Sequence, residues 1–140
     1  MKIALLHWHG LGDAIQLIPA VRKYKQKFPK DDLILFTLKR FGDTSKELLS
    51  GLSYFSDIYP ILDDAWQDGP DKYAANLRTV INDATKMAFD LKIPRVIPLY
   101  CIPDRGVLYN KVFRFSRDLG VAFSTYEDLA LEVPVNKLLK

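Results

Sequence analysis

Residues 7 to 19, HWHGLGDAIQLIP, contain several side chains whose types and spacing could do chemistry. A short apolar run ends, two glycines pass, and Asp13 stands just before a helical pattern. An aspartate in that place is a favoured helix N-cap, because its carboxylate accepts hydrogen bonds from free backbone N–H groups. The same carboxylate could also act as a general base toward a hydroxyl group. The spacing favours capping, but a carboxylate beside two glycines can do both jobs, so both interpretations stay open.

The loop before Asp13 consists of Gly10, Leu11 and Gly12. The two glycines allow positive φ and close approach of a ligand to the backbone. The following helix N-terminus offers N–H groups and partial positive charge, which together could bind phosphate. Neither nucleotide motif is met, since Ile15 stands where a dinucleotide fingerprint needs its third glycine and Gly-Lys-Ser/Thr is absent. Asp13 would repel a phosphate over that helix end, so we predict a neutral hydroxyl ligand beside it.

Four further residues are candidates for the same site. His7 and His9 form an H-x-H pair, but the chain has only 2 histidines and a metal site needs a third or fourth ligand. We therefore expect no metal ion, with one histidine packed at the strand end and the other lining a cleft. Asp104 and Arg105 follow the fourth predicted strand, so they should lie at the same edge as Asp13.

Hydrophobic spacing predicts alternating strands and helices. The expected strands are 3–7, 33–38, 56–62 and 95–100, and the expected helices are 14–28, 43–52, 73–91 and 107–119. Pro19 predicts a kink or restart in the first helix, and Pro98 predicts that the fourth strand is short or lies at an edge. This alternation is typical of a Rossmann-like α/β fold, with an open, mostly parallel sheet and helices on both faces. Residues 124–134 should be extended or irregular.

Length and charge exclude several classes of protein. A chain of 140 residues with 49% hydrophobic and 26% charged residues is enough for one globular domain. The net charge of +3 is too small to argue for nucleic acid, although the first 50 residues hold an excess of lysine and arginine that would suit an anionic molecule or membrane surface. The single cysteine, Cys101, allows no internal disulfide and is expected to be structural. No signal peptide or membrane-spanning segment is expected, and a cytoplasmic location fits.

The stretch GLGDAIQLIPAVRKYKQKFP, residues 10–29, resembles the N-terminal signature of glycosyltransferase family 9, the ADP-heptose lipopolysaccharide heptosyltransferases. Those proteins open with a short strand and a small-residue loop that ends in Gly-Asp. A proline follows six residues after the aspartate, and a basic helix then ends in Phe-Pro. The matching residues here are Gly12, Asp13, Pro19, Phe28 and Pro29. The later stretch LSYFSDIYPI, with Asp57, is similar to the third strand of the family.

This resemblance implies one half of a GT-B fold, in which two Rossmann-like domains face each other across a cleft. Residues 1–134 would be the acceptor-side domain, and 135–140 would begin an interdomain linker or tail. The family's Gly-Asp aspartate is the proposed base that deprotonates the acceptor hydroxyl, so that role would fall on Asp13. Transfer would invert the anomeric carbon without a metal held by Asp-x-Asp, a motif that this chain lacks. The substrate-binding residues would be Gly10, Leu11, Gly12, His7, His9, Asp104 and Arg105.

The resemblance also implies partners. The acceptor would be a glycan or lipid-linked sugar, and the donor a nucleotide-sugar bound mainly by a second domain for which this chain has no room. We therefore expect no cofactor of the chain's own, no nucleic-acid partner, and peripheral contact with the inner membrane as an option. A fragment inactive alone is the favoured interpretation, over a separate partner polypeptide or a stand-alone relic. The rivals are a non-catalytic Rossmann- or flavodoxin-like binding module, in which Asp13 only caps, and an oligomeric scaffold.

Overall fold

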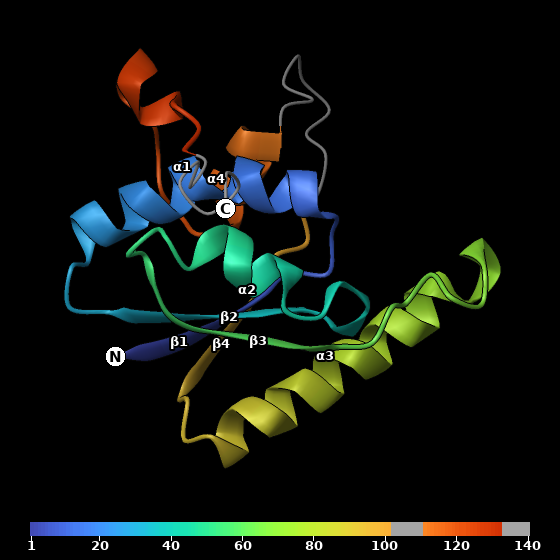
Figure 1. The fold of residues 1–140 in the computed structure, drawn as a ribbon. Helices are drawn as coiled ribbons and strands as arrows, with labels where there is room; N and C mark the ends of the chain where they lie inside the picture. Colours follow the sequence, from blue (N-terminus) through green and yellow to red (C-terminus); the bar gives the residue numbers. More distant parts are fainter. Residues whose placement is uncertain (102–110, 133–140) are drawn as a thin grey trace.

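The computed structural model describes residues 1–101 and 111–132, and in them four strands form one parallel sheet (Figure 1). The strands are β1 (Lys2–Leu6), β2 (Asp32–Leu38), β3 (Phe55–Leu62) and β4 (Arg95–Pro98). Their order in the sheet is β3-β2-β1-β4, and every neighbouring pair is parallel. The predicted strands are all present, with β4 short and at an edge as the position of Pro98 indicated.

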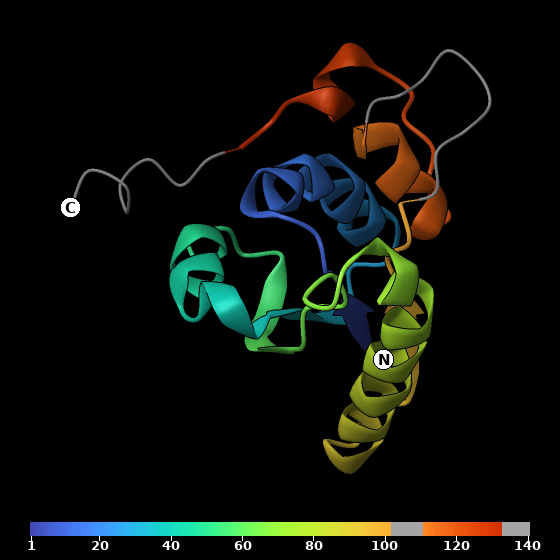
Figure 2. The ribbon, with the colours of Figure 1, turned by 90° about the vertical axis from the view of Figure 1, so that its right-hand side faces the viewer.

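Helices cover both faces of this sheet. They are α1 (Leu11–Lys27), α2 (Thr44–Leu49), α3 (Tyr73–Asp90) and α4 (Lys111–Asp118), with short 3-10 turns η1 (Lys39–Phe41), η2 (Pro70–Lys72) and η3 (Tyr126–Leu129). Three of the helices, α1, α2 and α4, lie on one face, and α3 lies on the other (Figures 1 and 2). The Rossmann-like α/β class expected from the sequence is therefore confirmed.

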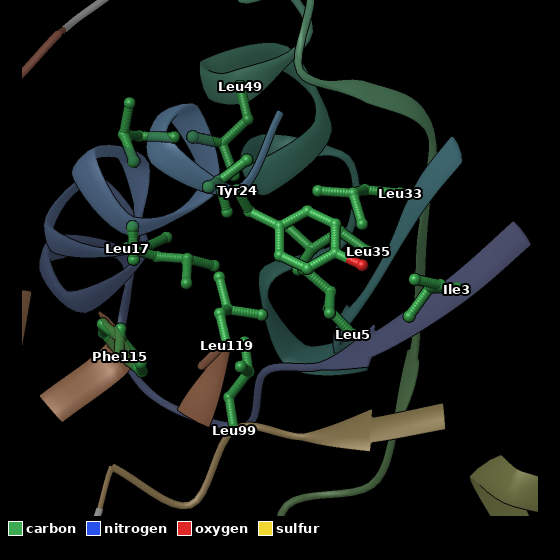
Figure 3. Packing of buried hydrophobic residues seen from close by; sticks show 14 of the residues in the cluster. Ile3, Leu5, Leu17, Tyr24, Leu33, Leu35, Leu49, Leu99, Phe115 and Leu119 are labelled. Carbon is green, nitrogen blue, oxygen red and sulfur yellow. The ribbon is translucent and has the colours of Figure 1, made fainter. Parts of the chain in front are cut away.

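The larger core lies between the sheet and α1, α2 and α4 (Figure 3). Side chains that point from β1 and β2 toward these helices are fully buried there, and Phe115 of α4 packs into the same cluster. The residues labelled in the figure are Ile3, Leu5, Leu17, Tyr24, Leu33, Leu35, Leu49, Leu99, Phe115 and Leu119. This layer fixes α1 and α4 side by side, which matters because both helices contribute to the candidate site.

The second core lies between the opposite face of the sheet and α3. The alternate residues of β1, Ala4 and Leu6, point into it and meet Ala84 and Ala88 of α3. Small side chains on α3 let the helix approach the sheet closely. Because β1 is buried on both faces, its sequence is continuously apolar rather than alternating, as is typical of a central parallel strand.

The structure corrects the prediction for the first helix. Helix α1 begins at Leu11 instead of residue 14, and it runs without a break through Pro19 to Lys27. Proline removes one backbone donor and strains the preceding turn. Pro19 is nevertheless buried on the face that packs against the sheet. Tertiary packing of that wide apolar face, which supplies most helical stability in proteins, outweighs the local cost.

Other boundaries differ less. The segment expected to be extended or irregular contains the 3-10 turn η3, which Thr125 caps by accepting a hydrogen bond from the N–H of Asp128. The first part of the predicted helix 107–119 and the predicted linker 135–140 lie outside the described residues. No described helix has the length and apolar character needed to cross a membrane.

Burial of β1 on both faces can be tested on two adjacent residues. Leu5 faces the larger core and Leu6 the core under α3, and both are fully buried. Leu5→Ala and Leu6→Ala should each lower the free energy of unfolding by about 2–5 kcal/mol, measured by urea denaturation, because each leaves a cavity. Leu131→Ala, at a residue 54% exposed, is the control and should change it by less than about 0.5 kcal/mol. A large effect at only one of the two positions would show that one face of β1 is open.

Candidate functional site

The candidate site lies where the chain changes direction on the sheet. From β1 the chain passes through α1 to β2 on one side, and it later returns through α3 to β4 on the other side of β1. In open α/β sheets, ligands bind in the crevice that forms at the carboxyl ends of the strands at such a point. The loops after β1 and β4 lie side by side at this point, because the Nε2 atom of His9 lies 2.6 Å from the carbonyl oxygen of Leu99.

Asp13 is not the N-cap of α1, in contrast to the sequence prediction. The extended residue Gly10, at φ −72° and ψ 171°, is the N-cap, and Asp13 is the third residue of the first turn. Its Oδ2 atom accepts a hydrogen bond from the Gly10 N–H at 3.3 Å. The carboxylate therefore supports the helix start from inside the first turn, which is the aspartate's half of a capping box. The apolar pattern begins later than the helix itself, because Leu11 is only partly buried and Gly12 is exposed.

The glycines of this loop do not use the conformational freedom expected of them. Gly10 has a negative φ and Gly12 lies inside α1, whereas positive φ among the glycines is found at Gly42, Gly69 and Gly120. What Gly12 provides is space, since a Cβ atom added there would meet nothing within 4 Å. The first turn of α1 is thus open to an approaching molecule on that side.

Lys111, the first residue of α4, completes the site and was not predicted from the sequence. Its Nζ atom donates to Oδ1 of Asp13 at 2.6 Å, and the Asp13 side chain is 19% exposed. Partial burial would raise the pKa of Asp13, but the hydrogen bond and charge of Lys111, helped by the Gly10 N–H, hold it below its ordinary value. Asp13 is therefore ionised at neutral pH. A carboxylate has about four acceptor positions, so these two donors leave room for a hydroxyl group.

Both histidines pack beside Asp13 and against α4. The His7 side chain is 2% exposed, and its Nε2 atom has no hydrogen-bond partner among the described residues. Burial is the main cause that lowers the pKa of His7 to about 3, and burial also lowers the pKa of His9. The two rings lie 5.2 Å apart, and each contacts the ring of Phe115. At neutral pH both imidazoles are uncharged, so they form a polar wall without adding positive charge.

The turn after β4 is held by α4. Cys101 has φ 54°, in the left-handed region that residues other than glycine rarely adopt. Its N–H donates to Oδ2 of Asp118 at 2.9 Å, which stabilises this strained turn. Burial raises the pKa of the Cys101 thiol and is also the first cause that raises the pKa of Asp118. The thiol is buried and protonated, as expected of a structural cysteine.

The structure brings together six of the predicted site residues where β1 ends and α1 begins: His7, His9, Gly10, Leu11, Gly12 and Asp13. Asp104 and Arg105 lie outside the described residues. Lys111, Phe115 and Asp118 were missed, because the helical pattern of 107–119 shows an apolar face but does not show which polar residue meets α1. In the part of the chain that the structure describes, no three His, Cys, Asp or Glu residues are placed to hold a metal ion.

Taken together, these features define a Rossmann-like α/β domain with a carboxylate at the carboxyl edge of its sheet. No protein family's profile matches the sequence, and no curated protein sequence matches it either. Among solved structures, the fold is similar to that of a glycosyl transferase family 9 protein from Veillonella parvula DSM 2008, with a TM-score of 0.51 at 11% sequence identity. The match covers 94% of this chain and 41% of that chain, so this chain spans less than half of its structural neighbour. At this identity the likeness establishes the fold.

The two histidines should make stability depend on pH below their ordinary pKa of 6.5. Each has a folded-state pKa below that value, so the unfolded chain binds protons first. The free energy of unfolding should fall as pH drops from 6.5 toward the His7 pKa of about 3, by up to about 1.4 kcal/mol per pH unit for His7 with a further decrease from His9, and level off above 6.5. In denaturant titrations, His7→Phe should remove the share of that slope that His7 contributes.

The aspartates are the same in both proteins, so the difference in slope between wild type and His7→Phe reports His7. Because the pKa values of Asp13 and Asp31 are lowered, the stability that these carboxylates contribute is lost at more acidic pH. The raised pKa of Asp118 has the opposite effect on the free energy of unfolding. A His7→Phe variant with the wild-type slope would show that the folded-state pKa of His7 is not lowered.

The contact between Asp13 and Lys111 should be measurable as a coupling. Lys111→Met should raise the pKa of Asp13, followed through its carboxyl carbon by NMR, because the main lowering interactions are lost. A double-mutant cycle with Asp13→Asn should give about 0.5–1 kcal/mol, as expected for a partly exposed pair. The matched pair Lys39–Asp63, in which both side chains are 61% exposed, should couple by less than that. Equal coupling in the two pairs would argue against a specific Asp13–Lys111 contact.

Proposed function

We propose that this chain is the acceptor-binding half of a glycosyltransferase similar to family 9, with Asp13 as the base. The transferred sugar would come from a nucleotide-sugar, ADP-heptose being the first to test, and the acceptor would be a hydroxyl of a glycan or lipopolysaccharide. The observation that carries the proposal is the position of Asp13, an ionised and partly exposed carboxylate at the ligand-binding edge of a fold shared with a family 9 protein. The sequence signature of residues 10–29 supports the same role.

The proposed step moves one proton and exchanges one bond. The acceptor hydroxyl gives its proton to the free acceptor position of the Asp13 carboxylate. The acceptor oxygen forms a bond to the anomeric carbon as the bond to the nucleoside diphosphate breaks, which inverts that carbon. A lowered pKa makes Asp13 a modest base, but the hydroxyl becomes acidic as its new bond forms. Aspartate and glutamate serve as bases in inverting sugar chemistry for this reason.

The chain would bind acceptor and leave the donor to a second domain. Transfer requires both sugars in one geometry, and holding them together contributes a large share of the rate. The structural neighbour is more than twice as long as the matched region, which leaves room there for a second domain. We propose that a second, donor-binding domain is supplied in the cell, either in the same polypeptide or by a partner protein.

The rival function is a non-catalytic binding module. It is favoured by one observation: both oxygens of Asp13 already have structural partners, Gly10 within the helix start and Lys111 of α4. In that case the carboxylate would serve to tie α4 to α1, and its loss would affect folding more than any reaction.

Asp13→Asn separates these functions. In the polypeptide that carries this chain in the cell, the variant should lower kcat for sugar transfer by about 100- to 10,000-fold, the usual contribution of a general base. The KM for acceptor should stay within a few-fold, since the amide keeps the shape of the carboxylate. The measurement is transfer from ADP-heptose and other nucleotide-sugars to lipopolysaccharide core oligosaccharides.

Asp32→Asn is the matched control, because Asp32 is exposed at the start of β2, at the opposite end of the sheet. It should leave kcat unchanged. If Asp13→Asn keeps full activity but lowers the melting temperature, the carboxylate is structural and the binding-module function stands instead.

A further inference from the structure

Aromatic side chains from three loops and from the start of α3 form a connected row at the carboxyl edge of the sheet, the same edge at which Asp13 lies. We define this row, Trp66, Tyr73, Trp8 and Tyr100, as the aromatic track. Trp66 stacks on Tyr73 with ring centres 4.0 Å apart and planes 21° from parallel. The Tyr73 hydroxyl accepts a hydrogen bond from Nε1 of Trp8 at 3.1 Å, and Trp8 meets Tyr100 edge-on at 5.4 Å.

The two ends of the aromatic track face solvent. Trp66 is 53% exposed and Tyr100 is 46% exposed, whereas Trp8 between them is 5% exposed. Since one face of the Trp66 ring is covered by Tyr73, its opposite face is the one left open. Burying such a ring would be favourable, so two large aromatic side chains held rigidly at a ligand-binding edge are suited to contact a ligand.

The surroundings of Trp66 are polar rather than apolar. A hollow of about 120 Å³ beside its turn is lined by Asp63, Asp64, Gln67, Asn76, Thr79 and Val80, and this is room for several waters or hydroxyl groups. The turn is well ordered by hydrogen bonds, since the Trp66 N–H donates to Asp64 and the Asn76 amide donates to Asp68. Carboxylates and amides offer the acceptors and donors that hydroxyl groups need.

An exposed aromatic ring on the same turn that borders such a polar hollow fits a sugar. One face of a pyranose ring is made of C–H groups that stack on an aromatic ring, and its rim carries hydroxyls that bind carboxylates and amides. A protein partner would instead meet a patch whose centre is depleted of charged residues. We propose that the aromatic track binds a neutral oligosaccharide, with one sugar ring stacked on Trp66.

Charge favours a neutral sugar over an anionic one. Nearby cations are already paired, Lys39 with Asp63 at 2.9 Å and Arg40 with Asp64 at 3.0 Å. Asp68 adds a further negative charge. A phosphate or carboxylate group at this hollow would therefore meet carboxylates, with these two cations already paired, and would be repelled.

The track also leads to Asp13. The Trp8 ring lies 5.2 Å from the ring of His9, and His9 lies in the short loop that leads to Asp13. A bound oligosaccharide could thus stack at one end and present a hydroxyl at the other. The assignment of this oligosaccharide as the acceptor rests on the proposed function, whereas its binding to the track does not.

Tryptophan fluorescence gives a direct test, because the chain has two tryptophans and only Trp66 is exposed. Acrylamide quenching should report Trp66, with buried Trp8 as an internal reference. Maltotriose, cellotriose and mannotriose should be titrated to about 10 mM, with trigalacturonate as the charged comparison. At least one neutral trisaccharide should lower the quenching constant about twofold, and trigalacturonate should bind at least fivefold more weakly.

Variants identify the contact. Trp66→Ala should weaken trisaccharide binding, measured by NMR titration of the full chain, at least about fivefold, and Trp66→Phe should recover part of it because a ring remains. Tyr126→Ala is the control, since Tyr126 is 93% exposed on η3 away from the track. Circular dichroism should show that each variant is folded.

Three results would overturn the inference. The first is that no trisaccharide changes the quenching of Trp66, and the second is that Trp66→Ala binds trisaccharide as tightly as wild type. The third is that sedimentation reveals a dimer that Trp66→Ala dissociates, which would make the track a protein interface.

Asp13→Asn keeps the two proposals apart. If this variant binds sugar but the whole polypeptide transfers sugar without needing Asp13, the proposed function fails and the sugar site stands. If transfer needs Asp13 but Trp66→Ala leaves the acceptor KM unchanged, the inference fails alone.

Discussion

Strand β1 is enclosed on all sides, and the candidate site depends on that enclosure. Helices cover both faces, β2 and β4 pair with its two edges, and residues 3–6 are fully buried. Pairing continues past the strand, because the His7 N–H donates to Phe36 and the Leu99 N–H donates to Leu6, each at 2.9 Å. The loop that carries His9 toward Asp13 therefore leaves from a rigid base. Groups that must meet a ligand in one geometry benefit from such support.

The contact between Asp13 and Lys111 serves two requirements that compete. It joins α4 to the start of α1, and it keeps the carboxylate ionised near two histidines that remain neutral. The same lysine makes Asp13 a weaker base than an unpaired carboxylate would be. In the proposed reaction, Asp13 would have to balance these two effects. This balance explains why the structural and catalytic interpretations of Asp13 share the same contacts.

Patterns within one element could be predicted from the sequence, while contacts between elements could not. Continuous apolar runs identified the central strands β1 and β2 clearly, because burial on both faces leaves such a run, whereas the edge strand β3 was only weakly marked. The helix start was misplaced because Leu11 and Gly12 break the apolar period, and Pro19 suggested a break that packing overrides. Lys111 is 98 residues from Asp13, and no local spacing connects them. The aromatic track was equally hidden, since its members come from three separate loops and the start of α3.

In the two proposals, the aromatic track and Asp13 would divide two tasks that one group could not perform together. A carboxylate can take a proton from any hydroxyl that reaches it, so by itself it selects neither the sugar nor the hydroxyl. A stacked ring fixes the plane of a sugar but does no chemistry. Trp8 connects the two, because its Nε1 atom is bonded to Tyr73 while its ring packs against His9. Selectivity for one hydroxyl would then arise from the distance between the stacking ring and the carboxylate. The buried carboxyl end of β1 and the start of α3 would keep that distance constant.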